Sequence, residues 1–243
     1  MPVPVSVSSA ITAVSSRRVP QSDRGVLADP PLLQAGRLAI ETRQLHGSAG
    51  VRVAGKALSE WRHESTTATL EAAVDYAARS GRTLPAHNPT GPLVVGGHQP
   101  TLFHCGVLIK NFALARLARH VQGTPLNLIV DNDIATPLHL AVPDGSRQEP
   151  ATRLVPFTSD TAARPWEDIK PDLSGAFTGF PERVTDALSR WGIEPVLPEI
   201  WPAAVSAAEQ GRGLSECLSS ARIALQDQFE HGTLELPISC LAT

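Results

Sequence analysis

The chain has 243 residues, of which 42% are hydrophobic and 19% charged, with a formal net charge of −3 and a pI near 6.2. A chain of this length and composition can bury a sizeable core. The slight negative charge argues against a general nucleic-acid or membrane-surface binder. No apolar run approaches the roughly 18 residues of a membrane-spanning helix. The three widely spaced cysteines exclude a disulfide framework and a cysteine-type zinc site, so we expect a cytoplasmic protein.

The first third of the chain is predicted to hold a tail and two helices. Residues 1–30 lack the positive-then-apolar order of a secretory signal, and we expect a flexible tail there. Residues 31–84 are expected to form a helical segment, with helices over residues 32–45 and 56–79. In the second helix one face is apolar, and these residues should be buried: Leu58, Trp61, Leu70, Ala73, Val74 and Ala77. The four tryptophans of the chain are all expected in the core.

A strand, a helix and a second strand follow. Residues 92–97 are continuously apolar, as expected for a strand buried on both faces. Residues 105–121 are predicted to form a helix, and residues 126–130 a second buried strand. A helix of this length between two strands is typical of a right-handed crossover, which makes the strands parallel. We therefore predict an α/β fold, a Rossmann-like parallel sheet with a βαβ core, over residues 92–243, preceded by the helical segment.

The remainder of the chain gives weaker patterns. Residues 137–202 contain ten of the 21 prolines, with a short strand predicted at 154–157 and a short helix at 182–191. Residues 214–231 form a clear amphipathic pattern that predicts a helix, and residues 233–238 are predicted to form a last strand. The sequence stops five residues after that strand, which suggests that more chain or a partner covers its edge.

The turn between the first strand and the helix, residues 96–111, carries the candidate site. Free N–H groups of a helix N-terminus and the carboxyl ends of parallel strands meet in such a turn, and α/β folds bind anions there. His98 ends the strand and His104 precedes the helix, so both are candidates for acid–base catalysis. Cys105 is expected to pack rather than act as a nucleophile. The glycines and amides of the turn are candidates for ligand binding: Gly97, Gln99, Gly106 and Asn111.

Lys110 is expected to face the sheet and to be catalytic. It falls in the middle of the apolar arc of its helix, within the first two turns, where the helix dipole disfavours a cation. A lysine in that place needs a negative partner, which a ligand or Asp131 or Asp133 could supply. These two aspartates end the second strand on one side of it, and they could also hold Mg²⁺ or orient a substrate. The plainer alternatives are a lysine that reaches solvent past the core and an ordinary Asp-Asn-Asp turn.

These motifs resemble two families. The sequence Gly97-His98-Gln99, the helix with Lys110 and the acidic Asp131-Asn132-Asp133 are similar to the cysteine-adding enzymes of bacillithiol biosynthesis, bacterial ligase-like proteins with a Rossmann-type core. The turn at residues 104–107 differs from that family, so the bacillithiol reaction itself is not expected. More distantly, Gly97, Pro100, His104 and Gly106 resemble the His-x-Gly-His turn of nucleotidyltransferases, with Val107 in place of the second histidine. The resemblance covers residues 93–133 and implies a nucleotide-binding ligase or transferase.

Three hypotheses follow. The favoured one is a cytoplasmic enzyme that binds a small molecule, ATP or another nucleotide with Mg²⁺ or another phosphorylated compound, for ligase-like or nucleotidyl-transfer chemistry. An alternative is a metal-dependent hydrolase, with His98, His104, Asp131 and Asp133 as metal ligands. The third is a non-catalytic remnant or interaction protein that keeps the turn for packing or docking. No oligomeric state is predicted.

Overall fold

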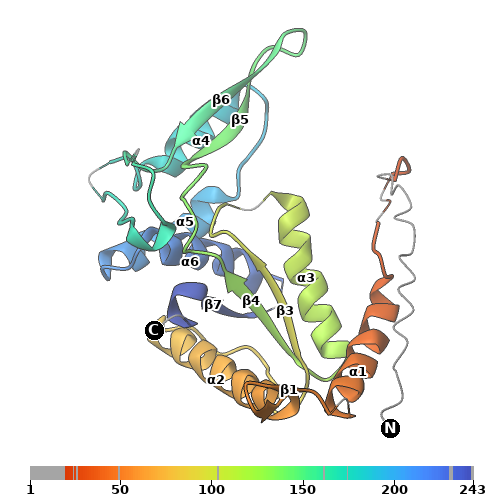
Figure 1. Cartoon of the computed structure of the whole chain (residues 1–243). Helices are drawn as coiled ribbons and strands as arrows, with labels where there is room; N and C mark the ends of the chain where they lie inside the picture. The colour runs from red at the N-terminus through yellow and green to blue at the C-terminus, as the bar shows by residue number, and fades with distance from the viewer. Residues whose placement is uncertain are drawn as a thin grey trace.

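A three-stranded parallel sheet in the order β3–β4–β7 lies at the centre of the molecule (Figure 1). Its strands are β3 (Leu93–His98), β4 (Thr124–Ile129) and β7 (Leu234–Pro237). The predicted α/β class is confirmed as a mixed fold with helices on both sides of a parallel sheet. The computed structural model describes residues 20–23, 25, 27–48, 50–102, 104–160, 162–173, 175–229 and 232–241. Most of the expected tail, residues 1–19, lies outside the described residues.

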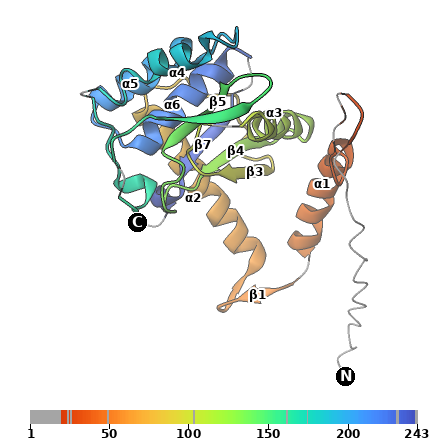
Figure 2. The same ribbon diagram turned by 90° about the horizontal axis from the view of Figure 1, so that it is seen from above.

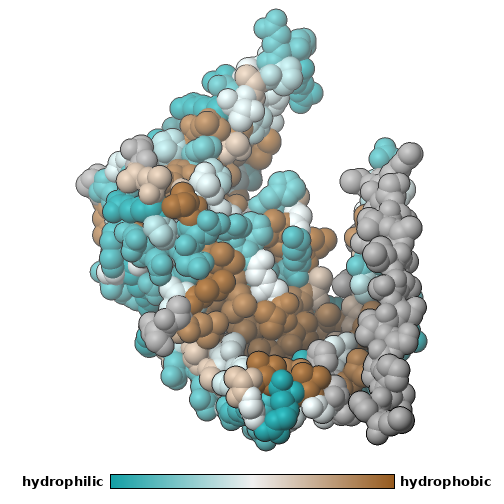
Figure 3. Space-filling model, viewed as in Figure 1, coloured by the Kyte–Doolittle hydropathy of each residue, from teal (hydrophilic) through white to brown (hydrophobic). Residues whose placement is uncertain are grey.

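The β3–α3–β4 unit has the predicted parallel pairing. β3 pairs with β4 from Leu93 opposite Thr124 to His98 opposite Ile129, and α3 (Cys105–His120) connects them. The expectation that β3 is buried on both faces is wrong. It is an edge strand, and its Val95 is 50% exposed. Apolar residues gather over the strands between α2 and α3 in the space-filling view (Figure 3).

Helices cover both faces of the sheet (Figure 2). On one face, α2 (Leu58–Arg79) packs its Leu70, Ala73 and Tyr76 against a row of leucines from the strands. On the other face lie α3 and α6 (Leu214–Asp227). Leu114 of α3 lies over Gly96 of β3, where an added Cβ would stand 3.6 Å from the leucine, at ordinary van der Waals distance. Because α2 shares a core with the strands, the helical segment packs directly on the sheet. The predicted boundary between a helical segment and a domain over residues 92–243 stays a prediction.

A buried ionic network joins α6 to β4 and β7. Arg222 of α6 binds Glu235 of β7 through two hydrogen bonds, Nε to Oε1 at 3.1 Å and Nη2 to Oε2 at 2.6 Å. Asn127 of β4, which lies opposite Glu235 in the sheet, donates to Oε1 at 3.2 Å. The side chains of Arg222 and Glu235 are only 4% and 0% exposed. The geometry therefore holds α6 in one position over β4 and β7.

The segment between β4 and β7 forms a second layer of structure. An antiparallel hairpin, β5 (His139–Gly145) and β6 (Pro150–Pro156), is followed by α4 (Phe180–Ser189) and α5 (Leu197–Glu209). The predicted strand at 154–157 and helix at 182–191 correspond to β6 and α4, but β5 and α5 were not predicted. The core of this layer contains the large aromatic side chains Phe157, Trp166, Phe177, Phe180 and Trp201.

The N-terminal helices differ in detail from the prediction. α1 spans Leu32–Ser48, and a short pair of strands, β1 (Arg52–Val53) and β2 (Lys56–Ala57), precedes α2. Trp61 is 41% exposed and Trp191 is half-buried, so the prediction that all four tryptophans are core residues is wrong. The Trp61 ring instead lies under the Lys56 ammonium, 4.6 Å from its centroid. No helix in the described part of the chain has the length and apolar character needed to cross a membrane.

The Arg222–Glu235 pair gives a stability prediction. Arg222→Ala leaves the buried Glu235 carboxylate without its cation, and we expect the free energy of unfolding to fall by about 3–5 kcal/mol in urea denaturation. The control is Arg37→Ala, which breaks an exposed pair with Glu41 on α1 and should cost less than about 1 kcal/mol. Equal losses in the two variants would show that the buried network does not hold the sheet and α6 together.

Candidate site at the carboxyl edge of the sheet

The three parallel strands end level with one another. His98, the last residue of β3, pairs with Ile129, and Ile129 pairs with Pro237 of β7. The turn that leads from β3 into α3 therefore lies at the same edge as Asp131 and Ser239, which follow β4 and β7. This is the edge at which open α/β sheets bind ligands. The predicted site residues from β3 and β4 are thus brought to one side of the sheet.

The turns after β3 and β4 also touch. Gln99 Nε2 lies 3.4 Å from Asp133 Oδ2, a long hydrogen bond that joins the two predicted groups of site residues. His98 is half-buried, with Nδ1 at 3.2 Å from the carbonyl oxygen of Gln99. Gly97, next to it, is exposed, and an added Cβ there would stand 3.0 Å from the Leu128 carbonyl oxygen. A glycine at this position lets β3 approach β4 without distortion.

Asp131 and Asp133 do not face the same side, which corrects the prediction. Asp131 is 3% exposed and accepts two hydrogen bonds from Ser239, one from the backbone N–H at 3.0 Å and one from the hydroxyl at 2.6 Å. Asp133 is exposed and turns to Gln99. The alternation of a strand is lost here because the Asp131 N–H bonds to the Ile129 carbonyl oxygen in a tight turn. Asp131 therefore points towards the end of β7, and Asp133 points towards the end of β3.

His104 serves as the N-cap of α3. Its Nδ1 accepts a hydrogen bond from the Gly106 N–H at 3.0 Å, and its carbonyl oxygen accepts from Val107 and Leu108. The N–H groups of Gly106 and Val107 are therefore bound within the turn, and they are not open to an anion as expected for a helix N-terminus at this turn. Cys105 was expected to pack and is exposed instead.

Lys110 is exposed, so the expectation that it faces the sheet is wrong. The buried side of α3 consists of Asn111, Leu114, Ala115 and Ala118. The small side chains of Ala115 and Ala118 let the helix pack closely on the strands. With this side of the helix against the sheet, Asn111 faces inward and Lys110 faces outward. Asn111 is 6% exposed, and its Nδ2 has no hydrogen-bond partner within the described residues.

A cavity of about 240 Å³ opens at this edge, beside the ends of β4 and β7. Its walls carry three carboxylates, Asp131, Glu167 and Glu216, against one guanidinium, that of Arg79. Ser215, in the first turn of α6, also lines it, and its buried hydroxyl has no partner within the described part of the structure. The remaining walls come from the end of α2, the start of α6, the end of β7 and the residues after it: Tyr76, Ser80, Gly213, Pro237, Ser239 and Cys240.

Two of these groups remain protonated at neutral pH. Burial, followed by the negative charge of Glu216, raises the pKa of Tyr76 far above its usual range. Burial also raises the pKa of the Cys240 thiol. Both side chains therefore act as neutral groups in the cavity, and the Tyr76 hydroxyl keeps its proton for donation. The negative charge of the cavity comes from its carboxylates.

The sequence analysis found only Asp131 among the residues of this cavity. The others come from segments that lie far apart in the chain, and no local motif connects them. One signal was available, because Glu216 follows Gly213 by three residues and its carboxylate accepts from the Gly213 N–H at 3.2 Å, as in a capping box. This signal marks the start of α6, but it does not indicate a ligand.

The structure gives the metal-hydrolase alternative no ligand set. Within the described residues, no three histidine, cysteine, aspartate or glutamate side chains lie close enough together to hold a metal ion. His104 caps its helix, and Asp131 and Asp133 diverge. The four ligands that the sequence suggested are therefore not grouped around one point.

Comparison of the chain with known protein families gives no match, and comparison with curated proteins gives none either. The resemblance to the bacillithiol cysteine-adding enzymes and to nucleotidyltransferases therefore stays a prediction.

The role of His104 can be tested by substitution. His104→Ala removes the N-cap of α3 and should lower the free energy of unfolding by about 0.5–2 kcal/mol, whereas His104→Asn restores a capping side chain and should recover most of it. The measurement is urea denaturation of both variants beside His120→Ala, an exposed residue at the other end of α3. If Asn fails to recover what Ala loses, His104 does not act as a cap.

Proposed function

We propose that the protein is a cytoplasmic enzyme of the ligase or transferase class that binds a nucleotide or another phosphorylated small molecule at the carboxyl edge of its sheet. The observation that carries this proposal is the cavity beside Asp131, at the point where all three parallel strands end. Ligands of Rossmann-like folds occupy this place. The sequence resemblance over residues 93–133 supports the choice of reaction class.

The two halves of the edge differ in charge, and this suggests how a ligand is oriented. The β4–β7 half holds the Asp131, Glu167 and Glu216 carboxylates, and the β3–α3 half offers His98 and Lys110. Phosphate oxygens are repelled by the first half unless a divalent cation lies between. Mg²⁺ is commonly held by one or two carboxylates together with substrate phosphates. The proposed ligand is therefore ATP or a similar nucleotide with Mg²⁺.

Asp131 and Glu167 are the carboxylates that would hold the ion. Their backbones are joined by a hydrogen bond from the Glu167 N–H to the Asp131 carbonyl oxygen at 3.1 Å, and both side chains line the cavity. Each oxygen of Asp131 accepts one hydrogen bond from Ser239 and keeps a second lone pair. Bound Mg²⁺ would supply charge neutralisation for the phosphates.

Lys110 keeps the contact with a ligand anion that its sequence position suggested, but it makes this contact from the solvent side of α3 rather than from the sheet side. Its side chain is exposed on the first turns of α3, and no ion pair joins it to a described residue. A flexible ammonium outside the edge can contact phosphate oxygens of a bound nucleotide as a point charge. His98, half-buried at the end of β3, is the remaining candidate for proton transfer.

A second candidate function is that of a non-catalytic remnant or interaction protein. It is favoured by the structural roles of His104, which caps α3, and of Asp131, which fastens the segment after β7. In such a protein the turn would be kept for packing alone. Nucleotide binding distinguishes the two functions.

Calorimetry with ATP and ADP, with and without Mg²⁺, tests the proposal. We expect binding that requires Mg²⁺, and Glu167→Gln should weaken it about tenfold or more because it removes one ligand of the ion. Asp168→Asn is the matched control, since Asp168 is the exposed neighbour of Glu167 and does not line the cavity.

A second pair of variants tests the phosphate contact. Lys110→Ala should weaken nucleotide binding several-fold, and Arg116→Ala, an exposed cation further along α3, should leave it unchanged. Absence of nucleotide binding at millimolar concentration, or equal effects of each variant and its control, would contradict the proposal and favour the non-catalytic function.

A further inference from the structure

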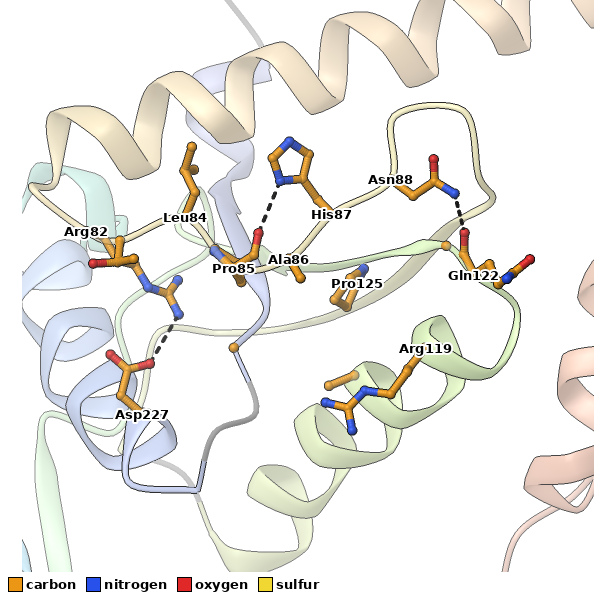
Figure 4. A pocket seen from close by; sticks show the side chains of 14 residues that line it. Arg82, Leu84, Pro85, Ala86, His87, Asn88, Arg119, Gln122, Pro125 and Asp227 are labelled. Carbon is orange, nitrogen blue, oxygen red and sulfur yellow. Dashed lines mark hydrogen bonds and ion pairs between the residues drawn. The ribbon is translucent and has the colours of Figure 1, made fainter.

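A second and larger cavity lies at the opposite, amino-terminal edge of the sheet. Its volume is about 600 Å³, within the range of small-molecule sites. It opens between the segment of residues 82–88, the end of α3 and the start of β4 (Figure 4). None of the residues proposed to bind the nucleotide lines it.

Two arginines enter this cavity from opposite sides, as Figure 4 shows. Arg82 follows α2, and Arg119 belongs to the last turn of α3. The Arg82 side chain is only 9% exposed, so its guanidinium is largely removed from water. It donates one hydrogen bond to the Thr233 carbonyl oxygen at 2.9 Å. Arg119 is exposed, and no acidic residue in the described part of the chain pairs with it.

The positive charge of the cavity is only partly neutralised. Its one described carboxylate, Asp227, lies 4.0 Å from Arg82, at the limit of an ion pair, and is itself 60% exposed. A guanidinium has five N–H donors, and the buried Arg82 uses one of them on a neutral carbonyl. Burying a cation with so little compensation is unfavourable. An anion between the two arginines would supply the missing partner.

Part of the remaining wall is apolar, and the segment that forms most of that part is held in place. Leu84, Pro85, Ala86, Ala115 and Pro125 give an apolar surface. The segment that carries three of them is fixed to the start of β4. Asn88 N–H donates to the Thr124 hydroxyl at 2.8 Å, the hydroxyl donates to the Asn88 carbonyl oxygen at 2.9 Å, and the Asn88 amide donates to the Gln122 carbonyl oxygen at 2.6 Å. A cavity with fixed walls loses little entropy when a ligand binds.

We propose that this cavity binds a small organic anion, whose phosphate or carboxylate lies between Arg82 and Arg119 while its apolar part rests against the prolines and Leu84. The planar guanidinium groups match either oxyanion with paired hydrogen bonds. The site lies at the other edge of the sheet from the proposed nucleotide site and does not depend on it.

Calorimetry of the full chain with phenyl phosphate, benzoate and the neutral benzyl alcohol tests this inference. We expect saturable binding of at least one anion and none of the alcohol, and the stronger of the two anions identifies the oxyanion preferred. Arg119→Gln should weaken that binding about tenfold or more, and Arg116→Gln, one turn earlier on the same helix and outside the cavity, should not. Arg116 and Arg119 are both exposed, so neither substitution should lower the melting temperature.

Absence of saturable anion binding at millimolar concentration, equal binding of benzyl alcohol, or equal effects of Arg119→Gln and Arg116→Gln would overturn the inference. The two sites are separated by Glu167→Gln, which should leave phenyl phosphate or benzoate binding unchanged. If nucleotide binding is lost in Arg119→Gln but kept in Glu167→Gln, the nucleotide binds in this cavity. That outcome would contradict the proposed nucleotide site at the carboxyl edge but not the anion site between the arginines.

Discussion

The bidentate pair between Arg222 and Glu235 is the constraint on which the rest of the structure depends. A buried carboxylate on a strand is tolerated only when it is paired and hydrogen-bonded, and Glu235 accepts hydrogen bonds from both Arg222 and Asn127. α6 consequently has one position relative to β7. That position brings the first turn of α6 to the carboxyl edge, where Ser215 and Glu216 line the smaller cavity.

The same strand organises the edge itself. After β7 the chain turns so that Ser239 reaches Asp131 with both its backbone N–H and its hydroxyl. Asp131 is thereby held at the cavity wall with a fixed orientation, beside Glu167. Asp131 can therefore serve both the fold and the proposed site. Its position fastens the C-terminal segment, and its free lone pairs remain available to an ion.

The central unit of the fold could be predicted from the sequence because its signals are local. The apolar runs before Gly96 and after Gly123, with one helix between them, define a βαβ unit, and the structure has the parallel pairing that such a unit implies. Tertiary packing decided the rest. The apolar arc of α3 suggested that Lys110 faces inward, whereas close packing of Ala115 and Ala118 turns Asn111 inward instead. In α5, Pro198 and Pro202 hid a helix. Proline is readily accepted in a first turn, where Pro198 lies, but Pro202 stands inside the helix, where proline is normally disfavoured.

The sequence predicted a site at the carboxyl edge, where the structure has a cavity, but it did not predict most of the residues that line this cavity. Gln99 and Asp133 meet there, because the ends of neighbouring strands in a parallel sheet lie close together. Arg79, Glu167 and Ser215 reach the cavity from three elements separated by long stretches of chain, so no spacing in the sequence reveals them. His104 looked like a catalytic residue because a histidine at a helix start can serve as acid, base or cap, and only the geometry distinguishes these roles.

The central claim is that a nucleotide with Mg²⁺ binds at the carboxyl edge of the sheet. Hydrogen–deuterium exchange of the full chain, with and without Mg²⁺ and ATP, tests it most directly. The account predicts slower exchange at residues 98–110, 131–133, 167 and 213–216, which surround that edge. Unchanged exchange there, or protection confined to residues 82–88 and 119–125 at the opposite edge, would contradict it.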